Sequence, residues 1–269
     1  MKAPAISVIL CTYNPRRDLL QRTLAAIDAQ SLPKDQIELI VVDNNSAAPL
    51  TDQDINPAGI LQARLVREPR QGLAFARQLG IRESRADLIV FVDDDNILAP
   101  DYLQRALPIS ADNPNIGAFS GIARGLYEVG HISRSKKPLL PFLGIRDDGA
   151  SPITSNVDRW GPWEPIGAGM VVRKTVAQLY CQILDSNPFA QKLDRSGDDI
   201  LSGSDSLLAR CAYRLNLACS YQPSLILDHF IKAARLETRY LRRLLVGHGR
   251  SYVLLHRALG KRFDSDTVP

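Results

Sequence analysis

Short apolar runs rich in β-branched residues alternate with amphipathic segments through the first half of the chain. The apolar runs cover residues 5–11, 38–42, 61–66 and 88–92, and the helix-like segments cover 15–30 and 72–84. Strands that alternate with helices predict a mostly parallel central sheet with helices on its faces. The pattern therefore predicts an α/β fold, and no internal repeat or hinge-like composition divides it into two domains.

The second half of the chain is less regular. Shorter elements are expected as a strand at 116–124, a helix at 207–215, and strands at 218–221 and 225–228. Residues 127–156 are rich in Gly, Pro, Ser and charge, which is typical of a long functional or mobile excursion. Residues 236–259 predict a basic amphipathic helix, either continuous or broken at Gly247 and Gly249.

Composition narrows the class of protein. At 269 residues, with 45% apolar and 23% charged residues, the chain has enough apolar material for a packed core. No apolar run is long enough to span a bilayer, and no leader-like segment opens the chain, so we expect a cytoplasmic protein. The four cysteines lack Cys-x-x-Cys spacing, and neither a zinc site nor a disulfide framework is predicted.

Polar clusters follow three of the expected strands, at residues 12–14, 43–45 and 93–95. The carboxyl ends of parallel strands meet at one edge of a sheet, where ligands bind, so these clusters should line a common cleft. The last cluster consists of three carboxylates, Asp93, Asp94 and Asp95, which repel one another unless a cation neutralises them. Carboxylate oxygens suit Mg²⁺ or Mn²⁺, whereas the alternative is a solvated acidic turn.

Four segments resemble family 2 glycosyltransferases of the GT-A fold, which is Rossmann-like. They are Ile6–Asn14 (ISVILCTYN), Leu39–Ser46 (LIVVDNNS), Leu73–Gly80 (LAFARQLG) and Ile89–Asp95 (IVFVDDD). The resemblance extends in order and spacing from residue 5 to about residue 250. It implies one GT-A domain over 1–230, with a nucleotide-binding half at 1–125 and an acceptor-binding half at 126–230. The basic helical region covers 231–269.

The resemblance implies a donor site for a nucleotide diphosphate sugar, with a preference for uridine. Thr12 and Tyr13 would lie at the edge of the base, Asp43 would accept hydrogen bonds from the base, and Asn14 belongs to the same donor site. Arg77 would approach the diphosphate or its metal. From the residues alone, Thr12 could instead cap the helix that starts near residue 15, and Arg77 could pair with an acid on a wet helix face.

The resemblance also implies a metal cofactor, Mn²⁺ or Mg²⁺. Asp93 would face the ribose, and Asp95 would ligate the ion. Asp94 lies between them and belongs to the donor site, but the resemblance does not assign it a specific contact. His229, in the segment 227–230 (LDHF), falls where metal-using relatives place a late histidine, and an imidazole could complete the coordination.

On the acceptor side, residues 160–163 (WGPW) and 167–173 (GAGMVVR) resemble the family segment that closes over the donor sugar and floors the acceptor site. Trp163, Gly167, Gly169 and Met170 are the expected contacts, because aromatic faces suit sugars and glycines allow close backbone approach. Core packing is the alternative for either tryptophan.

The segment 203–210 (GSDSLLAR) corresponds to the family's Gly-Glu-Asp-x-x-Leu-x-x-Arg pattern, with Ser204 where Glu is common. The resemblance makes Asp205 the general base that deprotonates the acceptor hydroxyl. The competing interpretation makes Asp205 a helix N-cap, and Asp198 and Asp199 are rival bases.

The implied function is an inverting, metal-dependent hexosyltransferase that moves a sugar to a glycan or lipid-linked acceptor in polysaccharide or glycan synthesis. A nucleotidylyltransferase is the enzymatic alternative, although residues 12–15 are not the Gly-rich phosphate loop that such enzymes show. A non-catalytic nucleotide-sugar-binding protein is the other alternative.

The basic C-terminal region bears on location. From Lys232 to Arg262 the chain has nine Lys or Arg residues and a single acid, Glu237. Apolar residues between the bases favour contact with an anionic membrane surface over nucleic acid, which is not expected as a partner. The protein is thus expected in the cytoplasm, either free with a solvated helix face or peripheral at the inner membrane.

Overall fold

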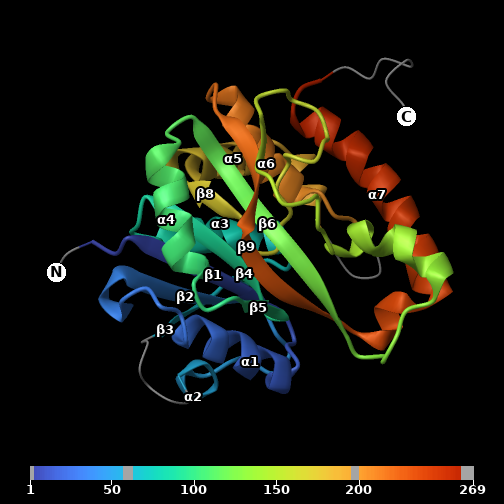
Figure 1. Cartoon of the computed structure of the whole chain (residues 1–269), viewed down its shortest axis with the longest axis horizontal. Helices are drawn as coiled ribbons and strands as arrows, with labels where there is room; N and C mark the ends of the chain where they lie inside the picture. The colour runs from blue at the N-terminus through green and yellow to red at the C-terminus, as the bar shows by residue number, and fades with distance from the viewer. Residues whose placement is uncertain (1–2, 57–62, 195–199, 262–269) are drawn as a thin grey trace.

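A nine-stranded mixed sheet forms the centre of the molecule, with helices on both faces (Figure 1). The structure is a computed structural model that describes residues 3–56, 63–194 and 200–261. The strand order is β3-β2-β1-β4-β8-β6-β9-β5, and β7 pairs with β9 at the side. The strands are β1 (Ile6–Thr12), β2 (Ile37–Asp43), β3 (Ala63–Arg67), β4 (Leu88–Asp93), β5 (Asn96–Leu98), β6 (Ile116–Tyr127), β7 (Ile153–Ser155), β8 (Val171–Arg173) and β9 (Ala218–Ile231). This confirms the predicted α/β fold.

Strands β1 to β4 form the parallel half of the sheet. β8 joins it antiparallel to β4 and β6, and β9 runs parallel to β6. The seven α-helices among the described residues are α1 (Arg17–Asp28), α2 (Asp52–Ile55), α3 (Leu73–Glu83), α4 (Tyr102–Asp112), α5 (Lys174–Ser186), α6 (Ser204–Arg214) and α7 (Thr238–Ala258). The 3-10 helices are η1 (Lys34–Gln36), η2 (Arg134–Leu143), η3 (Ala190–Lys192) and η4 (Ala233–Leu236).

Alternate residues of the strands feed two separate cores, as the period of two requires. Ile9 of β1 packs with residues of α3, α5 and α6 on one face. Val8 and Leu10 pack with residues of α1 and α4 on the other. All three side chains are fully buried, which explains why residues 8–10 of β1 are all apolar instead of alternating with polar residues.

Three expectations about the elements can be compared with the structure. The two short strands expected at 218–221 and 225–228 are one strand, β9, whose pairing with β6 shifts register between Ser120 and Ile122. The basic helix is continuous, since α7 runs from Thr238 to Ala258 without a break. Gly247 lies against the backbone carbonyl of Ile200, where a Cβ would stand 1.8 Å from the oxygen. The chain at 127–156 contains η2 and β7 and is not wholly irregular. None of the described helices has the length and apolarity required to cross a bilayer.

Candidate active site

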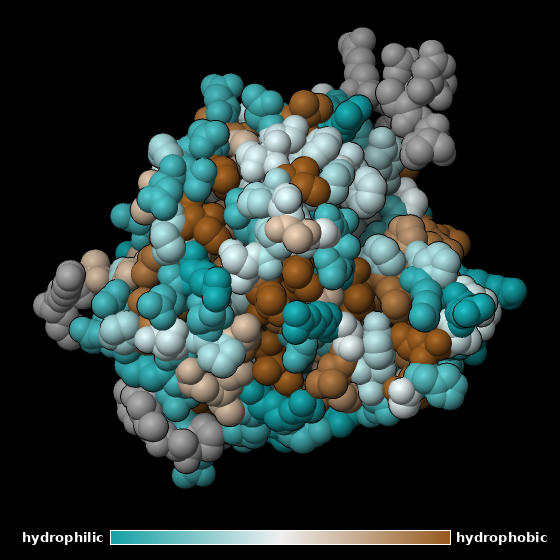
Figure 2. Space-filling model, in the orientation of Figure 1, coloured by the Kyte–Doolittle hydropathy of each residue, from teal (hydrophilic) through white to brown (hydrophobic). Residues whose placement is uncertain are grey.

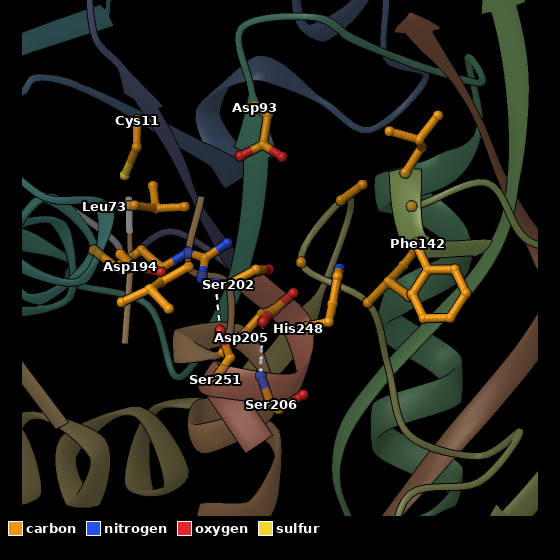
Figure 3. Close-up of a pocket in the computed structure, with 18 of the residues that line it drawn as sticks. Cys11, Leu73, Asp93, Phe142, Asp194, Ser202, Asp205, Ser206, His248 and Ser251 are labelled. Carbon is orange, nitrogen blue, oxygen red and sulfur yellow. Dashed lines mark hydrogen bonds between the residues drawn. The ribbon is translucent and has the colours of Figure 1, made fainter. Parts of the chain in front are cut away.

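The polar clusters expected at the strand ends do meet at one edge of the sheet. In the parallel pairing, Thr12 lies opposite Asp43, and Cys11 opposite Asp93. A cavity of about 890 Å³ opens at this edge, between the strand ends, the loop before β8, the start of α6 and the inner side of α7 (Figure 3). It is lined by nine of the predicted site residues: Thr12, Tyr13, Arg77, Asp93, Asp94, Asp95, Gly167, Asp205 and His229.

The first side of the cavity is held by a link between β1 and the acidic turn. The Thr12 hydroxyl donates a hydrogen bond to the Asp94 carboxylate. Burial raises the pKa of Asp94 to about 6, although this hydrogen bond opposes the rise. Helix α1 starts at Arg17 with no side-chain cap, so Thr12 is not a helix cap. Its position suits a contact between this turn and a bound ligand.

Asp95 and His229 form the second cluster. β5 pairs antiparallel with β9 and brings His229 opposite Asn96, so that His229 Nε2 lies 3.4 Å from Asp95 Oδ1. Arg235 Nη1 lies 3.8 Å from the other oxygen of Asp95. Burial alone would raise the pKa of Asp95, but the hydrogen bond with His229 and the nearby positive charges lower it, which keeps the carboxylate ionised.

These two side chains fit a divalent cation only as a partial ligand set. Within the described residues, no three His, Cys, Asp or Glu side chains are arranged to hold a metal ion. One carboxylate and one imidazole facing the same cavity suit an ion whose remaining ligands come from water and phosphate oxygens, which is the usual arrangement for Mg²⁺ at nucleotide sites. The residues present are therefore compatible with a metal that arrives together with a diphosphate.

Arg77 is the buried cation of the site. Only 3% exposed, it donates a hydrogen bond from Nη1 to the Ser204 hydroxyl at 2.9 Å and lies over the Phe91 ring at 5.7 Å. Burial alone would lower the pKa of Arg77, but the carboxylates of Asp205, Asp93 and Asp194 raise it. The alternative of a wet helix face is thus excluded. In the cavity its charge is available to an anionic ligand.

Asp205 lies in the first turn of α6, on the cavity wall next to Arg77. The helix begins after Gly203 and has no side-chain cap, so the N-cap interpretation of Asp205 is wrong. Its Oδ1 accepts a hydrogen bond from the Ser206 amide at 2.9 Å. A Cβ added to Gly167 would stand 2.7 Å from Arg77 Nη2 and 3.2 Å from Asp205 Oδ2. The rival bases Asp198 and Asp199 lie outside the described residues.

Two residues that were expected to contact the donor instead form hydrogen bonds within loops and do not line the cavity. Asn14 ties two loops together, since its Oδ1 accepts from the Ala47 amide at 2.9 Å. Asp43 is 1% exposed, and its two oxygens accept from the amides of Ser46 (3.1 Å) and Leu50 (3.0 Å). Both residues hold the loops next to the cavity in place, and direct contact of either residue with a base stays a prediction.

The expected sugar contacts need a larger correction. Met170 is fully buried in the core, and Gly169 is held with positive φ against Tyr102, whose hydroxyl donates to its carbonyl at 2.6 Å. Trp163 packs against the same core as Met170, whereas Trp160 lines the cavity and is 75% exposed. Of the four expected contacts, only Gly167 reaches the cavity wall.

Several wall residues were not expected from the sequence. Asp194 contributes a buried carboxylate near Arg77, and burial raises the pKa of Asp194 despite that positive charge. Glu164 and Arg210 form a buried ion pair at 3.0 Å. Only Arg210 carried a sequence signal, as the last residue of the segment 203–210. Leu244, His248, Ser251, Tyr252 and Leu255 add a wall from α7. In Figure 3 the Phe142 ring lies across the cavity from Cys11 and Leu73.

The chain is similar in sequence and in fold to known proteins. The family model described as "Glycosyl transferase family 2" matches residues 7–180. The succinoglycan biosynthesis protein ExoM of Rhizobium meliloti (strain 1021) is 29% identical over 125 residues, which cover 45% of this chain and 40% of that protein. In several such relatives the chain spans only about a third of the full length.

Two solved structures share the fold. The S. aureus TarS 1-349 structure aligns with a TM-score of 0.54 and 16% identity, covering 94% of this chain and 70% of that one. The structure of GalNAc-T7 with UDP, GalNAc and Mn2+ aligns with a TM-score of 0.59 and 13% identity, covering 85% and 44%. At these low identities the two structures support the fold of the chain and nothing about its activity.

Proposed function

Because the chain belongs to glycosyl transferase family 2, we propose that it is an inverting, metal-dependent glycosyltransferase that moves a hexose from a nucleotide diphosphate donor to an acceptor hydroxyl. The single observation that carries this proposal is the convergence of Arg77, Asp95 and Asp205 on one cavity. A buried cation and a candidate metal ligand can stabilise the leaving group of a sugar transfer. A carboxylate on the same cavity wall can accept the proton of the attacking hydroxyl.

The donor side is proposed to bind the nucleotide diphosphate, with uridine as the preferred base. Thr12 and Tyr13 line the cavity next to the acidic turn, and Arg77 faces its interior. Mn²⁺ or Mg²⁺ bound between Asp95 and His229 would neutralise charge on the diphosphate. The co-crystallised UDP and Mn2+ of GalNAc-T7 make this donor and metal the first ones to test.

Asp205 is proposed as the general base. Its carboxylate would accept the proton of the acceptor hydroxyl as that oxygen bonds to the anomeric carbon and the diphosphate leaves from the opposite face. Arg77, adjacent to Asp205 and buried, would stabilise the charge that the leaving group gains, and its fixed position needs no rearrangement during the reaction.

The acceptor is proposed to be a glycan or a lipid-linked sugar in polysaccharide or glycan synthesis. ExoM, by its name, serves succinoglycan biosynthesis, which makes polysaccharide acceptors the natural first panel. Trp160 replaces Trp163 as the candidate for sugar stacking, because it lies on the cavity wall with its ring exposed.

The deciding experiment compares Asp205→Asn with the wild type on a panel of nucleotide sugars with Mn²⁺. General-base catalysis is worth about 100- to 10,000-fold, so turnover should fall by that factor while the Kd for UDP stays within about twofold. Asp101→Asn, which alters an exposed carboxylate paired with Arg105, is the matched control and should retain activity.

An Asp205→Asn protein with wild-type turnover would contradict the assignment of Asp205 as the base. A wild type that binds donors but never turns them over would favour a non-catalytic binding protein, and release of diphosphate from a nucleotide triphosphate would favour a nucleotidylyltransferase.

A further inference from the structure

Helix α7 has two different faces. Its inner face lines the cavity with Leu244, Ser251 and Leu255, which are buried. Its outer face exposes arginines together with apolar side chains, and Val246 is 65% exposed. A solvated helix face normally carries polar residues, so valine and leucine side chains among arginines require an explanation. The exposed residues of this face include Arg239, Arg242, Leu245, Val246, Arg250 and Val253.

The 3-10 helix η2 lies next to α7 and contacts its cavity side at His248. Its Phe142 ring packs edge-to-face against His248 of α7, with ring centroids 5.2 Å apart, and is still 42% exposed. Arg134 and Lys137 of η2 are exposed beside it. Figure 1 shows η2 next to α7, and Figure 2 shows apolar and hydrophilic side chains side by side over this part of the molecule. We call the exposed residues of η2 and of the outer face of α7 the η2–α7 surface.

The charge of this surface has one sign. Residues 129–146 and 238–261 together contain ten Lys or Arg and no Asp or Glu. Among them, Arg146 and Lys261 form ion pairs with Asp148 and Asp158. Arginines on an amphipathic helix with exposed apolar residues between them are the pattern that binds the headgroup region of anionic bilayers. A soluble polyanion would use the arginines but would leave Val246 and Val253 in water.

We propose that the η2–α7 surface docks on an anionic lipid bilayer. The arginines contact the headgroups, and Val246 and Val253 enter the boundary between headgroups and acyl chains. Because α7 is also a wall of the cavity, docking brings the cavity within about one helix diameter, ~10 Å, of the lipid headgroups. An acceptor sugar held on a lipid would then lie near Asp205. This last step rests on the proposed function, whereas the docking itself does not.

The experiment sediments the full chain with phosphatidylcholine vesicles, with and without about a third phosphatidylglycerol. The wild type should bind only the anionic vesicles and retain binding at physiological salt. Each arginine near such a surface contributes about fivefold to partitioning, so Arg239→Glu with Arg242→Glu should weaken binding at least about 25-fold. Val246→Asp should remove the binding that survives salt, because the apolar contribution is not screened.

A matched control changes the same charge elsewhere. Arg22→Glu with Arg124→Glu alters two exposed arginines outside the η2–α7 surface and should bind vesicles like the wild type. Circular dichroism checks that all variants are folded, and nucleotide-sugar hydrolysis without vesicles reports on the catalytic proposal separately. Equal binding of the two double variants, equal binding to neutral vesicles, or binding to heparin without binding to anionic vesicles would overturn the proposal.

Discussion

Gly167 offers the sharpest test of the site geometry, because its missing side chain is what lets Arg77 and Asp205 lie next to each other. In Gly167→Ala the new Cβ would stand 2.7 Å from Arg77 Nη2, about 0.7 Å inside an ordinary contact. The φ angle of Gly167 is not positive, so alanine itself brings no backbone strain. The substitution therefore acts by displacing the guanidinium, and it also crowds Asp205 Oδ2 at 3.2 Å.

The size of the effect follows from that displacement. Arg77 is buried and held by Ser204, so it cannot swing into water and must shift within the cavity. A misplacement of about 1 Å at a reacting centre costs about 100-fold in rate, or about 2.7 kcal/mol of transition-state stabilisation. The cost in fold stability should be smaller, about 1 kcal/mol, because the clash falls on the end of a long side chain and Gly→Ala also restricts the unfolded chain.

The assay measures Mn²⁺-dependent hydrolysis or transfer with the best donor of the panel, alongside thermal unfolding. We expect kcat to fall roughly 10- to 100-fold with a change in Tm of only a few degrees. Gly249→Ala is the matched control, since no atom of the described residues lies within 4 Å of its added Cβ and alanine favours the helix. Wild-type kcat in Gly167→Ala would refute the assignment of Arg77 and Asp205 to the reaction.

Two further predictions concern the metal and the acid limit of stability. Asp95→Ala and His229→Ala should each weaken Mn²⁺ binding in the presence of UDP about 10- to 100-fold by calorimetry, and unchanged affinity in both would remove the proposed ion site. Burial alone would raise the pKa of Glu38, but hydrogen bonds from Ser7 and Arg85 lower it below its ordinary 4.5, so its stabilisation is present above that pH and is lost as pH falls. Glu38→Gln should lower the free energy of unfolding by about 2 kcal/mol at pH 7 and by much less at pH 3, and a pH-independent difference in urea titrations would contradict this.

The sequence by itself determined the parallel half of the sheet and the polar edge that lines the cavity. Each of β1, β2 and β4 is an apolar run that ends in polar residues, so local patterning places both the strand and its functional end. For the same reason Thr12, Arg77 and Asp95 were predicted from motifs whose residues are close in sequence, and all three line the cavity.

Only the tertiary structure decided which residues of the second half face the cavity. Trp160 and Trp163 lie in one short segment, and Met170 follows a glycine-rich turn. The local sequence pattern cannot show which of these side chains lines the cavity and which packs in the core. The sequence predicts that Asp43 contacts a ligand, but in the structure both of its carboxylate oxygens accept hydrogen bonds from the following loop. The α7 wall depends on the packing of α7 against η2, η3 and α6, and Asp194 reaches the site only through the fold of the whole chain. Such contacts arise from packing the whole domain, which no local periodicity encodes.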